Sequence, residues 1–141
     1  MMAPLKKARA AIVQPAPSPP ARQAQVVLDL EVADGRVHLV LANCGDAVAT
    51  DVSVKFSRKL RGLGGTVVIS ELPLFKQLGV LRPGVELRVF WDAATDIVSG
   101  REAKPFAATV SWAEPGVSQA RRSTYKHDPL VYRVWPESVN A

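Results

Sequence analysis

Residues 26–112 are dominated by apolar and polar side chains that alternate with a period of two. In the first stretch Val26, Leu28, Leu30 and Val32 fall on one side, and Asp29 and Glu31 fall on the other. Successive residues of a β-strand point to opposite faces of a sheet, so this pattern predicts a strand with one buried face. Four more stretches follow the same rule. In each, every second residue is expected to point inward, from Val37 to Leu41, from Thr50 to Phe56, from Val85 to Trp91 and from Phe106 to Trp112.

Turn-forming residues separate these stretches. Glycine and asparagine tolerate positive φ and proline presets φ, so clusters of the three mark reversals of the chain. The clusters are Asp34-Gly35, Asn43 to Asp46, Arg82-Pro83-Gly84 and Glu114-Pro115-Gly116. Residues 121–127 supply a last strand. We therefore expect an all-β fold, an immunoglobulin-like antiparallel β-sandwich of about seven strands, with Trp91 and Trp112 in its core.

The remaining segments are less regular. Residues 91–100 are the one helical candidate, but they are few and rich in β-branched side chains. The other expectations are a mobile basic loop at 58–65, a short strand at 66–70, an edge or crossing segment at Leu72 to Phe75, and a weak extension at Leu130 to Trp135.

Proline and charge set the first residues apart. Five of the 11 prolines lie in residues 1–24, which have little to bury and are expected to form an extended or disordered arm. The β-sandwich is expected at 25–135 and a short tail at 136–141. The net charge is +5, and residues 1–28 hold four basic residues and no acid. The other 14 basic and 13 acidic residues leave only +1, which gives no global footprint for nucleic acid.

No apolar run approaches the ~18 residues that a membrane span needs. The first 25 residues contain only Ala10 to Val13 as an apolar stretch, too short for a standard signal peptide. The single cysteine cannot form an internal disulfide, which favours a reducing compartment or a particle. We expect a protein of the cytoplasm or of a particle and leave its location otherwise unassigned.

The residues that usually carry chemistry do not form a recognisable site. Cys44 sits in an Asn-Cys-Gly turn without a neighbouring base, so we interpret it as a turn residue. His38 and His127 have no metal-ligand spacing and are expected at the surface. The sequence lacks a Gly-x-Ser-x-Gly elbow and a P-loop. We therefore predict that the protein is not an enzyme and uses no cofactor.

Clustered basic residues are the candidate interaction sites. One cluster surrounds residues 55–61 and a second lies near the end of the predicted domain. Such clusters can attract phosphate or a sulfated polymer. With the basic residues of the arm, the candidates are Lys6, Lys7, Arg9, Arg58, Lys59, Arg61, Arg121, Arg122 and Lys126.

Two segments carry a resemblance to a known family. "VHLVLANCGDAVATDVSVKF" has a strand that ends in Asn43-x-Gly45 and a second alternating strand through Val52 and Val54. "LGVLRPGVELRVFWD" has a Leu-x-Pro-Gly turn that introduces another strand. Over residues 26–112 this pattern resembles bacterial immunoglobulin-like modules of the CARDB type (cell-adhesion-related domain in bacteria). The resemblance implies a sandwich fold and names no active site.

These features predict a non-catalytic module for protein–protein interaction or structure. It would assemble through its arm and an exposed sheet edge, with a protein partner or a second copy. One alternative is a virion or particle component, such as a decoration or tail protein. Another is the binding of a polyanion or nucleic acid through the basic loops.

Overall fold

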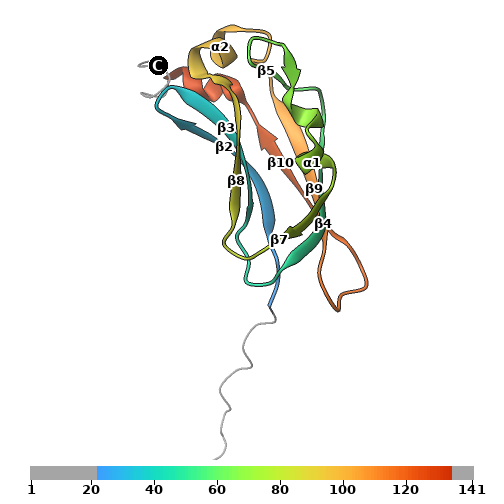
Figure 1. The fold of residues 1–141 in the computed structure, drawn as a ribbon. Helices are drawn as coiled ribbons and strands as arrows, with labels where there is room; N and C mark the ends of the chain where they lie inside the picture. The colour runs from blue at the N-terminus through green and yellow to red at the C-terminus, as the bar shows by residue number, and fades with distance from the viewer. Residues whose placement is uncertain (1–21, 135–141) are drawn as a thin grey trace, which may run out of the picture.

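A computed structural model of the chain describes residues 22–134. These residues are mostly β-structure, with antiparallel sheets of three and four strands packed together and a few short helices (Figure 1). In chain order the elements are β2 (Val26–Ala33), β3 (Arg36–Asn43), β4 (Ala49–Phe56), β5 (Arg61–Gly62), β6 (Val67–Val68), η2 (Ile69–Glu71), α1 (Pro73–Lys76), β7 (Leu78–Leu81), β8 (Glu86–Ala93), α2 (Ala94–Ser99), β9 (Phe106–Ala113), β10 (Arg121–His127) and η3 (Pro129–Val134).

The strands divide into two main sheets. One has the order β2-β3-β8 and the other β10-β9-β4-β7, and every neighbouring pair is antiparallel. Within residues 22–134, the short strands β5 and β6 pair with each other and with no other strand. The arrangement is consistent with a β-sandwich, and the predicted all-β class is confirmed at this level.

The first hairpin forms as the sequence predicts. β2 pairs with β3 from Val26–Asn43 to Ala33–Arg36 without a shift in register. The two residues between the strands, Asp34 and Gly35, have φ values of 52° and 72°. Positive φ at both central positions defines the turn whose twist matches that of the flanking strands, and Asp-Gly is a preferred pair for it.

Large apolar side chains fill the space between the two sheets. Trp91 of β8 and Trp112 of β9 are 0% and 2% exposed, which confirms their predicted place in the core. The Trp91 ring meets Phe106 edge-on, with ring centroids 5.8 Å apart. β9 alternates strictly between buried and half-buried residues, as the period of two requires. Each fully buried side chain of this size stabilises the fold by about 2 kcal/mol.

A β-bulge changes which residues of β4 face the core. The ladder between β4 and β9 shifts register between Thr50 and Ser53, and Asp51 has a φ of 50°. Ala49 and Val52 are consequently buried, whereas Thr50 is half-buried. The expected inward position of Thr50 is therefore wrong, because an inserted residue breaks the period of two.

The segment after β4 is more ordered than expected. Leu60 and Ile69 are buried, and β5 and β6 form a small hairpin between them. The predicted mobile loop at 58–65 is thus anchored through Leu60, and the predicted strand at 66–70 shortens to the two residues of β6 before η2 begins. Leu60 is not part of an alternating apolar pattern, so the sequence could not predict that its side chain would be buried.

Short helices decide three further expectations, correcting two and confirming part of one. The segment Leu72 to Phe75 is largely the helical turn α1, whose Pro73 occupies the first turn and whose Phe75 is buried. The helical candidate at 91–100 is confirmed for its central part, which forms α2 at Ala94–Ser99. The weak extension at 130–135 is wrong, because residues up to 134 belong to the 3-10 helix η3.

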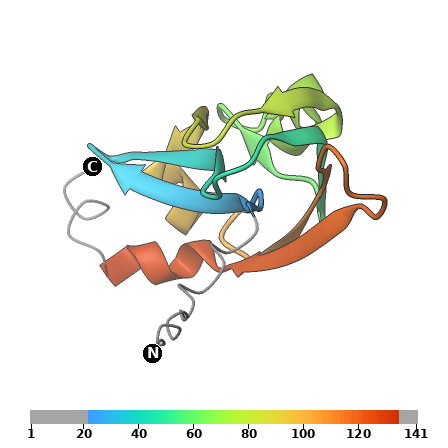
Figure 2. The same cartoon turned by 90° about the horizontal axis from the view of Figure 1, so that it is seen from below.

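The chain's connections gather at the two ends of the sheets. The first described residues lie beside the β3–β4 and β7–β8 connections at one end, and α2 and η3 lie at the other (Figure 1). Figure 2 shows the β2–β3 hairpin and the β9–β10 pair as separate layers.

Asn43 connects three separate segments at the first of these ends. Its side-chain oxygen accepts from the backbone N–H groups of Gln25 (3.1 Å) and Gly45 (3.0 Å). Its side-chain nitrogen donates to the carbonyl groups of Ala47 (2.8 Å) and Leu81 (3.0 Å). Asn43 is 1% exposed, and its bond to the Leu81 carbonyl is buried, whereas the other three bonds are partly buried.

We expect Asn43→Ala to lower the free energy of unfolding by about 3 kcal/mol, because it removes four hydrogen bonds and leaves buried partners unsatisfied. Cys44→Ser changes the adjacent, exposed residue and should alter stability by less than about 0.5 kcal/mol. Urea unfolding followed by circular dichroism measures both variants. Equal stability of the two would contradict a bracing role for Asn43.

Candidate functional site

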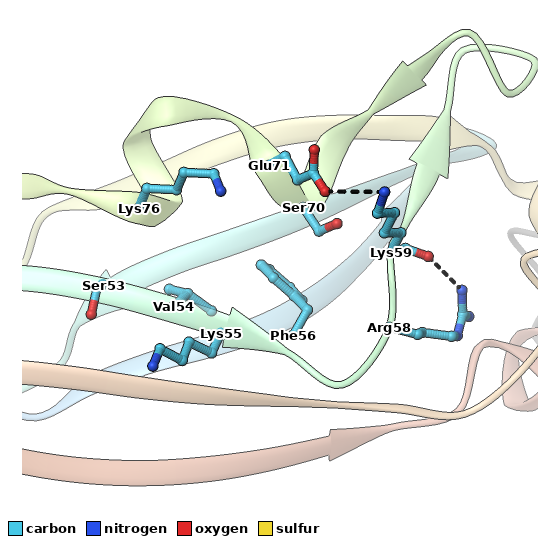
Figure 3. A pocket seen from close by; sticks show the side chains of 9 residues that line it. All are labelled: Ser53, Val54, Lys55, Phe56, Arg58, Lys59, Ser70, Glu71 and Lys76. Atoms are coloured by element: carbon cyan, nitrogen blue, oxygen red, sulfur yellow. Dashed lines mark hydrogen bonds and ion pairs between the residues drawn. The ribbon is translucent and has the colours of Figure 1, made fainter.

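A surface hollow lies where β4 runs beneath η2 and α1 (Figure 3). It encloses about 570 Å³. Its lining mixes cations, hydroxyl groups and the apolar side chains of Val54 and Phe56. The full lining is Ser53, Val54, Lys55, Phe56, Arg58, Lys59, Ser70, Glu71 and Lys76.

The hollow exists because β7 is shorter than β4. The ladder between the two strands ends at Val52–Leu78, after which the chain on that side belongs to α1 rather than to a strand. β9 continues to pair with the other side of β4 as far as Phe56. Because backbone groups alternate in direction along a strand, those of Val54 and Phe56 face the hollow without a strand partner in the described part of the chain.

Lysine side chains surround this opening. Lys55 comes from β4, Lys59 from the following connection and Lys76 from α1, and all three are exposed. Figure 3 shows them on different sides of the hollow. The one acid in the lining, Glu71, lies 3.6 Å from Lys59 Nζ, and both side chains are largely exposed. Such an exposed pair is weak and screened by salt, so the hollow keeps an excess of positive charge.

Arg58 has a different role from the lysines. Its guanidinium pairs with Glu102 at 2.7 Å and donates to the carbonyl groups of Glu102 (2.9 Å) and Lys104 (2.8 Å). It also lies over the Phe106 ring, 5.7 Å from the centroid. With its donors engaged within the chain, Arg58 braces the connection before β9 and is a poor candidate for binding a partner.

The other predicted site residues are dispersed. Arg61 is exposed on β5, and its carbonyl accepts from the Trp91 indole at 2.9 Å. Arg122 and Lys126 are exposed on β10. Arg121 pairs with the buried carboxylate of Glu114. Lys6, Lys7 and Arg9 lie outside the described residues.

The structure therefore brings Lys59 together with residues that the sequence did not select. Lys76 is 17 positions from Lys59 in the chain and directly follows the segment Leu72 to Phe75, which was expected to be an edge or crossing segment. Ser70, whose hydroxyl accepts from the Leu60 N–H at 3.0 Å, was also missed. The only sequence signal was the basic run at 55–61, which includes Lys55.

Two carboxylates hold the start of the described chain. Ala24 N–H donates to Glu114 (2.8 Å), and Gln23 N–H donates to Asp46 (2.8 Å). Gly45 packs against this segment so closely that an added Cβ would lie 2.1 Å from the Gln23 carbonyl oxygen. The Ala24 amide, aided by Arg121, holds the pKa of the Glu114 carboxyl below its ordinary value, against the opposing effect of burial.

The described residues offer few groups for other chemistry. Cys44 is exposed, and residues 22–134 contain no cluster of three or more His, Cys, Asp or Glu side chains that could hold a metal ion. The histidines are half-buried rather than at the surface as expected: His38 packs edge-on against Phe90, and His127 Nε2 lies 2.8 Å from the Leu28 carbonyl oxygen. Within the same residues, no helix has the length and apolarity to cross a membrane.

These features define an antiparallel two-sheet protein with a basic surface hollow and a fixed point of entry for its N-terminal segment. A family model described as a domain of unknown function (DUF8453) matches residues 6–133, and the chain belongs to this family. Comparison with curated proteins and with solved structures gives no match.

Glu114 makes stability depend on pH. Its folded-state pKa is depressed, so its contribution is complete above the unfolded-state pKa and is lost as pH falls through the folded-state value. We expect Glu114→Gln to cost about 2 kcal/mol at pH 7 and to flatten the loss of stability at acid pH. Thermal unfolding between pH 3 and pH 7 measures this. Glu71→Gln, which removes an exposed carboxylate, is the control and should retain the acid-dependent loss.

Proposed function

We propose that this protein is a non-catalytic module for protein–protein interaction or structure, which assembles through an open sheet edge and its N-terminal arm. The observation that carries this proposal is the edge strand β8. Among the described residues β3 is its one strand partner, and Phe90 on β8 and Val85 just before it are each 37% exposed. An unpaired strand with exposed apolar side chains is a template for adding a strand from a partner.

The strand order supports the finer assignment to an immunoglobulin-like sandwich. The order β10-β9-β4 corresponds to strands G-F-C of that fold, and the order β2-β3-β8 corresponds to strands A-B-E. β7 lies beside β4 and corresponds to the strand that pairs with E in constant-type domains, here moved to the other sheet.

Contacts between two turns support the resemblance to CARDB modules. The Asn43-x-Gly45 turn and the Leu81-x-Pro83-Gly84 turn are distant in sequence. Gly84 N–H donates to the Asn43 carbonyl oxygen at 2.8 Å, and the Asn43 side chain donates to Leu81. The two motifs thus stabilise one another, which gives a physical reason for their joint presence.

The anchored segment at 23–25 supports a role for the arm. Glu114, Asp46 and Asn43 each accept a backbone N–H from it, so the chain before residue 22 starts from a fixed point. A fixed starting point reduces the conformational entropy that a flexible segment loses when it binds.

We expect deletion of residues 1–21 to leave the melting temperature unchanged, because it spares the anchored segment, and to weaken association. Affinity purification from the native host, with light scattering of the recovered complexes, compares the full and shortened chains. A chain lacking residues 1–25 is the control that should lose stability, since it also removes the bonds to Glu114 and Asn43.

Two results would count against this function. Equal association of the full and shortened chains would remove the arm from the mechanism. Recovery of both as monomers without a partner would contradict an assembly role altogether.

Binding of a polyanion is a second candidate, favoured by the three exposed lysines around the hollow. They bring positive charge from three elements to one opening, beside the uncovered backbone of β4. A chain of phosphate or sulfate groups gains affinity by releasing counterions at each such contact.

We expect the triple variant Lys55→Ala, Lys59→Ala, Lys76→Ala to bind heparin more weakly. The slope of log affinity against log salt should become less steep by about 2. Arg58 is left intact because it braces the fold. The matched control replaces exposed arginines outside the hollow, Arg36, Arg82 and Arg101, with alanine. Equal losses in the two variants would show that net charge alone governs retention.

A further inference from the structure

The two edges of the three-stranded sheet are protected very differently. β2 and β10 end their sheets on the same side of the molecule, and side chains of β10 cover the β2 backbone. The Tyr125 hydroxyl donates to the Val26 carbonyl at 2.9 Å, and His127 Nε2 donates to the Leu28 carbonyl at 2.8 Å. Gln25 in turn donates to the Tyr125 hydroxyl at 3.0 Å. These bonds occupy backbone acceptors that a partner strand would need.

β8 has no comparable cover along most of its length. Its contact with β5 lies at one end, where Leu63 N–H donates to the Trp91 carbonyl at 3.3 Å. From Val85 to Phe90, the described residues place no strand on its outer side. Val85, Phe90 and Leu63, the last of which is 46% exposed, follow this edge. They make up half of the exposed large apolar residues in the described chain.

The direction of the backbone groups decides which residues can pair. Asn43 N–H donates to the Val85 carbonyl, so Val85 and, by alternation, Leu87 and Val89 face β3. Glu86 and Arg88 therefore present their N–H and C=O groups to the open side. A partner strand would bond to these residues.

We propose that the partner of this edge is the β8 strand of a second copy of the chain, paired antiparallel about a twofold axis at Leu87. The proposal rests on the assembly function proposed above and specifies its edge and its partner. In this register Glu86 of each copy is opposite Arg88 of the other. Both residues face the open side, so their backbone groups can form the mutual pair of hydrogen bonds of an antiparallel ladder.

Charge complementarity favours this partner and this register. The Arg88 guanidinium reaches across β3 to Glu31 of β2, to which it donates at 2.8 Å and 2.9 Å, and its Nη2 lies 3.2 Å from Glu86 of the same strand. Its side chain remains 50% exposed, as does that of Glu86. A twofold axis at Arg88 would instead place two arginines opposite each other, which is unfavourable.

Charge reversal provides the test. In Glu86→Arg the opposed residues are two arginines, and in Arg88→Glu they are two glutamates. We expect the unchanged protein to have about twice the mass of its 15.2 kDa chain in light scattering, and each variant to dimerise at least about tenfold more weakly. An equimolar mixture of the two variants restores opposite charges at both positions and should form a heterodimer at concentrations where each alone is a monomer.

The control is Arg122→Glu, which reverses an exposed charge on β10 and should leave the dimer intact. Circular dichroism confirms that each variant is folded, and the heterodimer could not form from unfolded chains. A monomeric unchanged protein would overturn the proposal. A dimer insensitive to both reversals, or variants that fail to combine, would do so too. If the charge-reversal variants still associated, β8 would be excluded as the interface, and the proposed assembly function would still stand.

Discussion

The fold depends on one buried amide. Asn43 ends β3, and its side chain satisfies two donors and two acceptors, one of each in the adjacent turn and one of each at the distant residues Gln25 and Leu81. An unpaired polar group at that depth would cost free energy, so each of these partners must stay in place for the others to be satisfied. The position of the N-terminal segment, the shape of the β3–β4 turn and the end of β7 are thus fixed together.

The strands could be predicted because one face of each is buried. Side chains then alternate, and the sequence records the alternation directly, as in β9 and in the β2–β3 hairpin. The prediction failed where a single contact decides the structure. The bulge at Asp51 shifts β4 by one residue, and Leu60 anchors a segment that is otherwise basic and glycine-rich. Such features have no period, and only tertiary packing reveals them.

The candidate site was predictable only in part. A run of basic residues marked the region, but it did not distinguish Arg58, which is engaged within the chain, from Lys59, which is exposed. Lys76 joins the hollow because β7 stops short and α1 takes its place beside β4. A run of basic residues shows where an anion could be attracted. Whether each side chain is free to bind that anion depends on its partners in the fold.

The hydrogen bonds from β10 side chains to the β2 backbone also limit the addition of further strands to the sheet. Strand addition is the first step toward open-ended stacking, which needs two receptive flanks on every molecule. Here the Tyr125 and His127 side chains already occupy one flank. A chain that docks along β8 would therefore leave the three-stranded sheet with no second free edge, and this sheet could not extend into a fibre through its own edges.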